Sequence, residues 1–185
     1  MDSLPPQPLL TLEPLIEAVR MGVEAEAWEL SGLQKTTSHQ FEGRWAGDST
    51  RSAYLFFHLP GGPDWAGVDV FLDETNEGLR GNLALVVDGC ALDRLGDAPT
   101  ALAALGGLAV THLATGHRTP VTLRLRLEHG AQEPGSASTE FRVKLVIPAQ
   151  ALRDGAPSVA ALSSAAVRAF RALLADPALA RYLDL

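Results

Sequence analysis

The spacing of apolar residues divides the first half of the chain into one helix and a run of strands. Apolar residues recur at helical spacing from Leu12 to Val23, which predicts a helix that Thr11 caps and Gly22 ends. Alternating or continuous apolar runs then predict five strands. These are Trp28–Leu33, Gln40–Trp45, Arg51–Leu59, Trp65–Leu72 and Leu79–Val87.

The second half of the chain has the pattern of a helix, two strands and a helix. A helix begins at Asp97 and continues to Leu113, and Pro157 opens the last one. Two alternating segments, Val121–Leu127 and Phe141–Ile147, lie between them. The order is therefore helix, four or five strands, helix, two strands, helix.

This order predicts the fold class. Strand runs joined by short turns form a largely antiparallel sheet, and the helices then pack on one face of it. We expect a two-layer α+β domain over residues 11–185. Residues 1–10 contain three prolines and are expected to form a flexible N-terminal segment.

Composition narrows the classes of function. The 185 residues are 46% hydrophobic with a net charge of −7, which is typical of a globular protein and argues against nucleic-acid or anionic-membrane partners. The N-terminus lacks the basic region of a signal peptide, and the longest apolar runs, Leu83–Val87 and Ala101–Val110, are too short to span a membrane. The single cysteine, Cys90, is predicted to be a buried, inert thiol. These features favour the cytoplasm.

No stretch of the sequence carries a catalytic or metal-binding motif. The G-x-S-x-G elbow, the phosphate-binding loops and the H-E-x-x-H pair are all missing. His58 and His112 are interpreted as partly buried histidines with hydrogen-bond partners. The acidic group near Asp73–Gly78 is interpreted as a solvated turn. We therefore expect no catalytic residue, no cofactor and no metal site.

The last two strands carry four cations at outward positions, which are Arg124, Arg126, Arg142 and Lys144. If Leu127 lies opposite Phe141, like charges face each other across the strands, which is destabilising. A register shifted by two residues places Glu128 opposite Arg142 and relieves part of this repulsion. Two interpretations stay open: a solvated face of mixed charge, or a small basic platform for an acidic partner surface.

Aromatic residues concentrate in the first group of strands, and most of them are expected in the core. The segment Arg51–Leu59 is apolar on both faces, which predicts a central strand covered on both sides. If one sheet face lacks a helix, however, Phe56 and Trp65 become part of an exposed apolar surface that suits a second copy or a client protein.

The run Arg51–Leu59, the pair Val121–Leu127 and Phe141–Ile147, and the flanking helices resemble the small acidic chaperones of type III secretion and the related YbjN family. The resemblance covers roughly Leu12 to Leu174, rests on element order and acidity, and departs from that pattern by one or two extra strands. It implies a two-layer α+β fold that dimerises and binds other proteins without catalysis. No functional residue transfers.

The sequence thus favours a non-catalytic, homodimeric protein-binding module, chaperone-like or adaptor, with a protein client. The rival hypothesis is a small-molecule-binding or catalytic domain. Its pocket would lie between the middle helix and the sheet, where Gly106-Gly107 leave room and His58, His112 or Asp69 supply polar contacts.

Overall fold

A computed structural model describes most of the chain. The described residues are 12–37, 40–41, 44–45, 49–75, 78–93, 97–114, 121–128 and 138–182. The expected N-terminal segment and the Thr11 cap lie outside these ranges.

The helices and strands follow one another along the chain in much the order that the apolar pattern predicts. The helices are α1 (Leu12–Glu24), α2 (Gly89–Asp93), α3 (Ala98–Ala114), α4 (Ala149–Asp154), α5 (Ala156–Leu174) and α6 (Pro177–Ala180). The strands are β1 (Glu29–Thr37), β2 (Gln40–Phe41), β3 (Arg44–Trp45), β4 (Ser49–His58), β5 (Ala66–Thr75), β6 (Gly78–Asp88), β7 (Val121–Glu128) and β8 (Ser138–Val146).

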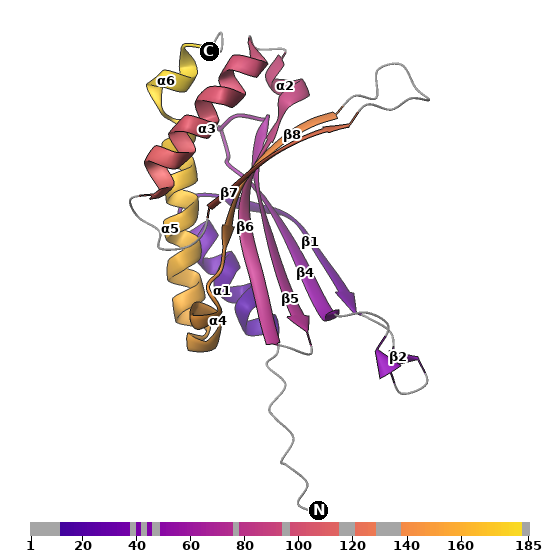
Figure 1. Cartoon of the computed structure of the whole chain (residues 1–185). Coiled ribbons are helices and arrows are strands. Elements are labelled where there is room, and N and C mark those ends of the chain that lie inside the picture. Colours follow the sequence, from indigo (N-terminus) through magenta and orange to yellow (C-terminus); the bar gives the residue numbers. More distant parts are fainter. Residues whose placement is uncertain are drawn as a thin grey trace, which may run out of the picture.

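Six strands form one antiparallel sheet in the order β1-β4-β5-β6-β8-β7. All the described helices lie on one side of this sheet (Figure 1). The predicted two-layer α+β class is therefore confirmed. Because β8 pairs with β6, the second group of strands extends the first sheet and forms no separate layer.

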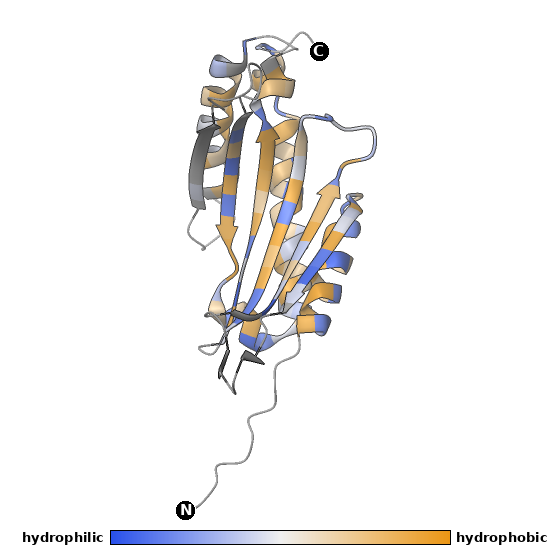
Figure 2. Ribbon diagram, turned by 90° about the vertical axis from the view of Figure 1, so that its right-hand side faces the viewer, coloured by the Kyte–Doolittle hydropathy of each residue, from blue (hydrophilic) through white to orange (hydrophobic). Residues whose placement is uncertain are grey.

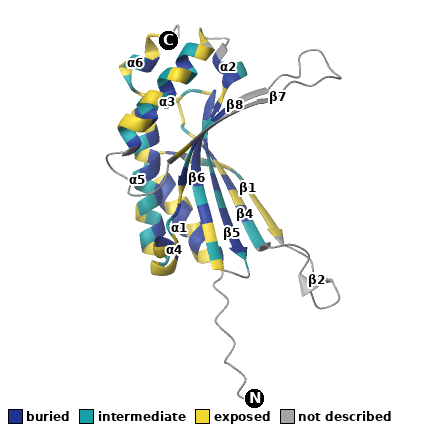
Figure 3. Cartoon of the chain, viewed as in Figure 1, coloured by how far each residue is buried: buried dark blue, intermediate teal, exposed yellow. Residues whose placement is uncertain are grey.

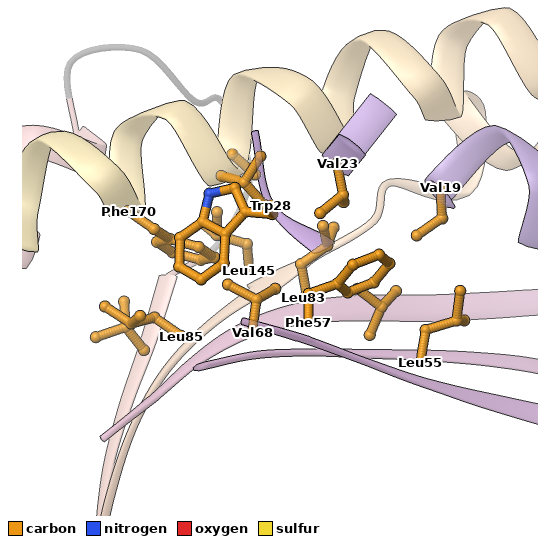
Figure 4. Packing of buried hydrophobic residues seen from close by; sticks show 14 of the residues in the cluster. Val19, Val23, Trp28, Leu55, Phe57, Val68, Leu83, Leu85, Leu145 and Phe170 are labelled. Carbon is orange, nitrogen blue, oxygen red and sulfur yellow. The ribbon is translucent and has the colours of Figure 1, made fainter. Parts of the chain in front are cut away.

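The core lies between the sheet and the helices α1, α3 and α5. Apolar side chains from the inner face of the sheet meet those of α1 and α5, and the Trp28 ring lies against α5 beside Phe170 (Figure 4). Both of these side chains are buried. The sheet supplies Leu55, Val68 and Leu83 to the same cluster.

Gly22 was expected to end the first helix, and that prediction is wrong. The helix continues to Glu24, and the chain turns at Ala27, which has a φ of 64°. Gly22 instead faces α5, where a Cβ on it would lie 2.3 Å from the carbonyl oxygen of Ala160. The glycine therefore allows α1 and α5 to pack closely.

Three local predictions differ from the structure. The segment Gln40–Trp45 was expected to be one strand, but it forms the separate two-stranded pair β2-β3. The chain after Asp88, where no helix was predicted, forms the short helix α2, because the Asp88 carboxylate accepts hydrogen bonds from the backbone N–H groups of Cys90 (2.9 Å) and Ala91 (3.1 Å). Cys90 is only half-buried there. No helix was predicted from the sequence at the position of α4.

Candidate protein-binding face

The sheet has one face without a covering helix among the described residues, here called the open face. Along β4, the side chains of Ala53, Leu55 and Phe57 point toward the helices and are at most 2% exposed. Tyr54 and Phe56 alternate with them and are 38% and 37% exposed. The strand was expected to be covered on both sides, and that prediction is wrong. Figure 2 looks onto the open face, and Figure 3 shows the burial along the same strands.

Three aromatic residues on β4 and β5 form the aromatic patch of the open face: Tyr54, Phe56 and Phe71. The rings of Tyr54 and Phe71 lie opposite each other in the strand register, with centroids 4.8 Å apart and tilted by 39°. The Phe56 ring lies over Gly32 of β1, since a Cβ there would be 3.3 Å from Cδ2 of Phe56. The patch therefore extends to the edge of the sheet.

A charged cluster adjoins the aromatic patch. Arg142 of β8 forms an ion pair with Asp69 of β5 at 3.0 Å, and it also binds both carboxylate oxygens of Glu140. Burial raises the pKa of Asp69 above its usual value, while the charge of Arg142 opposes the shift. Asp69 lies directly opposite Phe56 in the register. Apolar and ionic groups thus meet in the middle of the open face.

The expected basic platform has a different composition. The register of β7 and β8 is neither of the two predicted, because Leu125 lies opposite Phe141. Arg126 is therefore opposite Glu140, and Arg124 is opposite Arg142. The side chains of Arg124 and Arg126 lie outside the described residues.

Two of the four cations have described side chains. Arg142 is bound by two carboxylates, so it is not a free cation. Lys144 lies opposite Thr122, half-buried. The open face therefore carries mixed charge in its described part.

Trp65 does not belong to the open face. Its side chain is 3% exposed and packs in the core, and its backbone oxygen accepts a hydrogen bond from the Asp88 N–H at 2.8 Å. The prediction that it lines an exposed surface is wrong. Of the two aromatic candidates, only Phe56 lies on the open face.

The acidic group near the β5–β6 connection is structural. Asp73 is fully buried and accepts hydrogen bonds from Ser52 and Arg80, both at 2.7 Å. Glu74 is also buried and pairs with Arg51 at 2.7 Å. The interpretation as a solvated turn is wrong for these two residues, because β5 continues through them to Thr75.

The two described histidines lie on different elements and do not converge. His58 is exposed at the end of β4, with its Nε2 atom 3.7 Å from Glu29. His112 on α3 is hydrogen-bonded through Nε2 to Asp176 at 2.9 Å, which lowers the pKa of that aspartate. His112 has the environment that was predicted, whereas His58 is more exposed than expected. His39, His117 and His129 lie outside the described residues.

The rival hypothesis needed a pocket between α3 and the sheet. Among the described residues, α3 instead fills that space with the fully buried side chains of Ala101, Leu105, Ala109 and Leu113. Gly107 faces open space, since a Cβ there meets nothing within 4 Å. The described part of the chain also contains no group of three or more histidine, cysteine or acidic residues placed to hold a metal ion.

A depression of about 750 Å³ lies elsewhere, between the α1–β1 turn, the β4–β5 loop and α5. Its lining residues are Glu24, Ala27, Trp28, Glu29, Leu30, Leu59, Pro60, Gly61, Gly62 and Arg171. No local pattern along the chain indicates this depression, because its walls come from three segments that are distant in the sequence.

One described stretch, residues 156–180, is long and apolar enough to cross a membrane by length and composition. This is weak evidence for a membrane span, because the core helix of a water-soluble protein passes the same test. In this fold the stretch contains α5, which buries Val159, Val167 and Phe170 in the core.

Comparison with known proteins finds no matching family model, no similar curated protein and no similar solved structure. The geometry of the open face and of the depression therefore carries the functional argument.

Proposed function

We propose that this chain is a non-catalytic protein-binding module, chaperone-like or adaptor, that dimerises through the open face and binds a client protein. The observation that carries the proposal is the exposure of Tyr54 and Phe56 on a wide sheet face to which the described helices contribute no cover. Aromatic side chains are enriched at protein interfaces, and a second copy is the simplest way to cover such a face.

The size of the open face suits a dimer. The neighbouring strands β1, β4, β5, β6 and β8 lie about 4.8 Å apart and rise about 3.4 Å per residue. Strands of about ten residues then give a face of about 800 Å², which is close to what each partner contributes to a stable interface. The charged cluster of Asp69, Glu140 and Arg142 contains both positive and negative groups. Two copies can therefore approach each other without a cluster of like charges on each side.

The arrangement of titratable groups supports a role without catalysis. His58 and His112 each lie beside a carboxylate of their own, and neither lines the depression. The rival pocket between α3 and the sheet has no observation in its favour among the described residues.

The element order also supports the proposed likeness to type III secretion chaperones and the YbjN family, although six strands exceed their pattern. The proposal includes a cytoplasmic location and excludes nucleic acid and membrane as direct partners, on the basis of the net charge of −7.

The test is the mass in solution, measured by light scattering. We expect a dimer for the wild type and a folded monomer for Phe56→Asp, because a charge buried in an apolar interface is strongly unfavourable. Met21→Asp is the matched control, since Met21 is 60% exposed on α1 and lies on the opposite side of the sheet.

The control variant should remain dimeric, and circular dichroism should show that both variants are folded. A monomeric wild type, or a dimer that survives Phe56→Asp, would contradict the proposed interface.

A further inference from the structure

The depression beside α5 has a partly apolar lining and a size that accommodates a small ligand or a few residues of a peptide. Leu30, Leu59 and Pro60 line it and keep accessible surface, whereas Trp28 is buried. Its volume of about 750 Å³ lies within the usual range for ligand sites. An apolar side chain placed here would extend the core outward.

One wall of the depression carries a cation without an acceptor. Arg171 has no hydrogen bond or ion pair from its side chain to any described residue, and it is exposed. The acid whose charge it influences, Glu26, is already bound by Arg168 at 2.5 Å and by Ser164 at 2.7 Å. The guanidinium of Arg171 is therefore available to a carboxylate, which it can bind through two parallel hydrogen bonds.

The other wall carries two carboxylates with weak partners. Glu24 lies 3.6 Å from Arg20, and Glu29 lies 3.7 Å from His58. Both distances are too long for strong hydrogen bonds. These acids can therefore accept hydrogen bonds from a ligand, and they disfavour an anion that brings no hydrogen-bond donors.

A buried donor lies in the same region. The Nε1 atom of Trp28 is buried and has no acceptor among the described residues. Because this atom is covered by protein, it does not reach into the depression and is not a ligand contact. At the rim, Gly61 adopts a φ of 68°, and a side chain there would meet nothing within 4 Å, so the β4–β5 loop leaves the depression open.

We propose that this depression binds the C-terminal residue of a peptide that ends in an apolar side chain. The terminal carboxylate pairs with Arg171, and the side chain lies on Leu30, Leu59 and Pro60. The peptide N–H groups donate to Glu24 and Glu29. A fatty acid would supply the carboxylate and the apolar chain but no donors, so the two acids favour a peptide. This site is separate from the open face and does not require the dimer.

The test uses short fluorescein-labelled peptides of alanine that end in leucine, phenylalanine or valine, measured by fluorescence anisotropy. The free-acid peptides should bind saturably, whereas the same peptides with an amidated C-terminus should bind at least about tenfold more weakly, as expected for loss of a charged hydrogen bond. Decanoate should compete poorly.

Arg171→Met should weaken binding of the free-acid peptides to a similar extent, because it retains the aliphatic stem and removes the charge. Arg153→Met is the control, since Arg153 lies on α4 and bonds only to Gln150 among the described residues. It should leave binding unchanged.

Equal affinity for free-acid and amidated peptides, no saturable binding to the wild type, or tight binding of decanoate alone would overturn the proposal. Light scattering separates its failure from that of the proposed dimer. Arg171→Met should leave the dimer intact, and Phe56→Asp should leave peptide binding intact.

Discussion

The two faces of the sheet both carry large apolar side chains, but these differ in how far they are buried. On β4, Leu55 and Phe57 are nearly inaccessible, whereas Tyr54 and Phe56 on the alternate positions are more than a third exposed. The helices account for the difference, since they lie on one side only. An apolar strand therefore indicates burial on at least one face, and on the other face of β4 no described helix supplies it.

The largest expected effect comes from comparing two neighbouring residues on β4, one on each face. Phe57→Ala should lower the free energy of unfolding by about 3–5 kcal/mol, because it leaves a cavity under the helices. Phe56→Ala should change it by about 1 kcal/mol or less in the monomer. Urea unfolding at a concentration where light scattering shows monomer measures both. Similar losses for the two variants would mean that the faces do not differ energetically.

The covered side also depends on how closely its helices approach. Gly22→Ala should destabilise the fold by about 1–3 kcal/mol, because the new methyl group would collide with the backbone of α5 at Ala160. Gly107→Ala is the matched control, since a Cβ on that helical glycine meets nothing. It should raise stability by up to about 1 kcal/mol. Equal effects in thermal unfolding would refute the close packing of α1 and α5.

A smaller effect distinguishes the two sides by their response to pH. Hydrogen bonds from Arg168 and Ser164 lower the pKa of Glu26 from 4.5 to about 2, so its stabilising effect is complete above pH 4.5 and is lost as the pH falls toward 2. The raised pKa of Asp69 has the opposite sign. The protonated form is favoured in the fold, so stability declines as the pH rises from 3.8 through the raised value.

The variants Glu26→Gln and Asp69→Asn should each remove one of these two slopes. Urea midpoints measured from about pH 2 to about pH 7 would show this. If Glu26→Gln left the acid loss of stability unchanged, the link between the α1–β1 turn and α5 would not contribute as described.

Local patterns predicted the elements well because alternation and helical spacing act within a few residues. The alternating run that predicted a strand over Trp65–Leu72 forms β5, in which Ala66, Val68, Val70 and Leu72 are buried. Alternation does not apply to Trp65, because that residue precedes β5 and its side chain is not held to one face of the strand. Its ring therefore packs inside, although strict alternation would place it with Phe71 on the open face.

Pairing between distant strands was beyond the reach of local patterns. The connection over residues 129–137 is long enough to permit several registers of β7 and β8, and the one adopted places Arg126 opposite Glu140. The partner of Arg142 on the central sheet, Asp69, comes from β5, which lies two strands away. No spacing along the chain indicates that pair or the walls of the depression.

The packing of α1 against α5 has a consequence for how the protein is made. On the ribosome, α1 emerges before any strand, while α5 follows the last strand of the sheet. The apolar side of α1, with Ile16 and Val19, therefore waits without its main partner during most of synthesis. Exposed apolar surface in such intermediates promotes aggregation. The nascent chain is thus most vulnerable just before α5 appears, and completion of that helix closes the core.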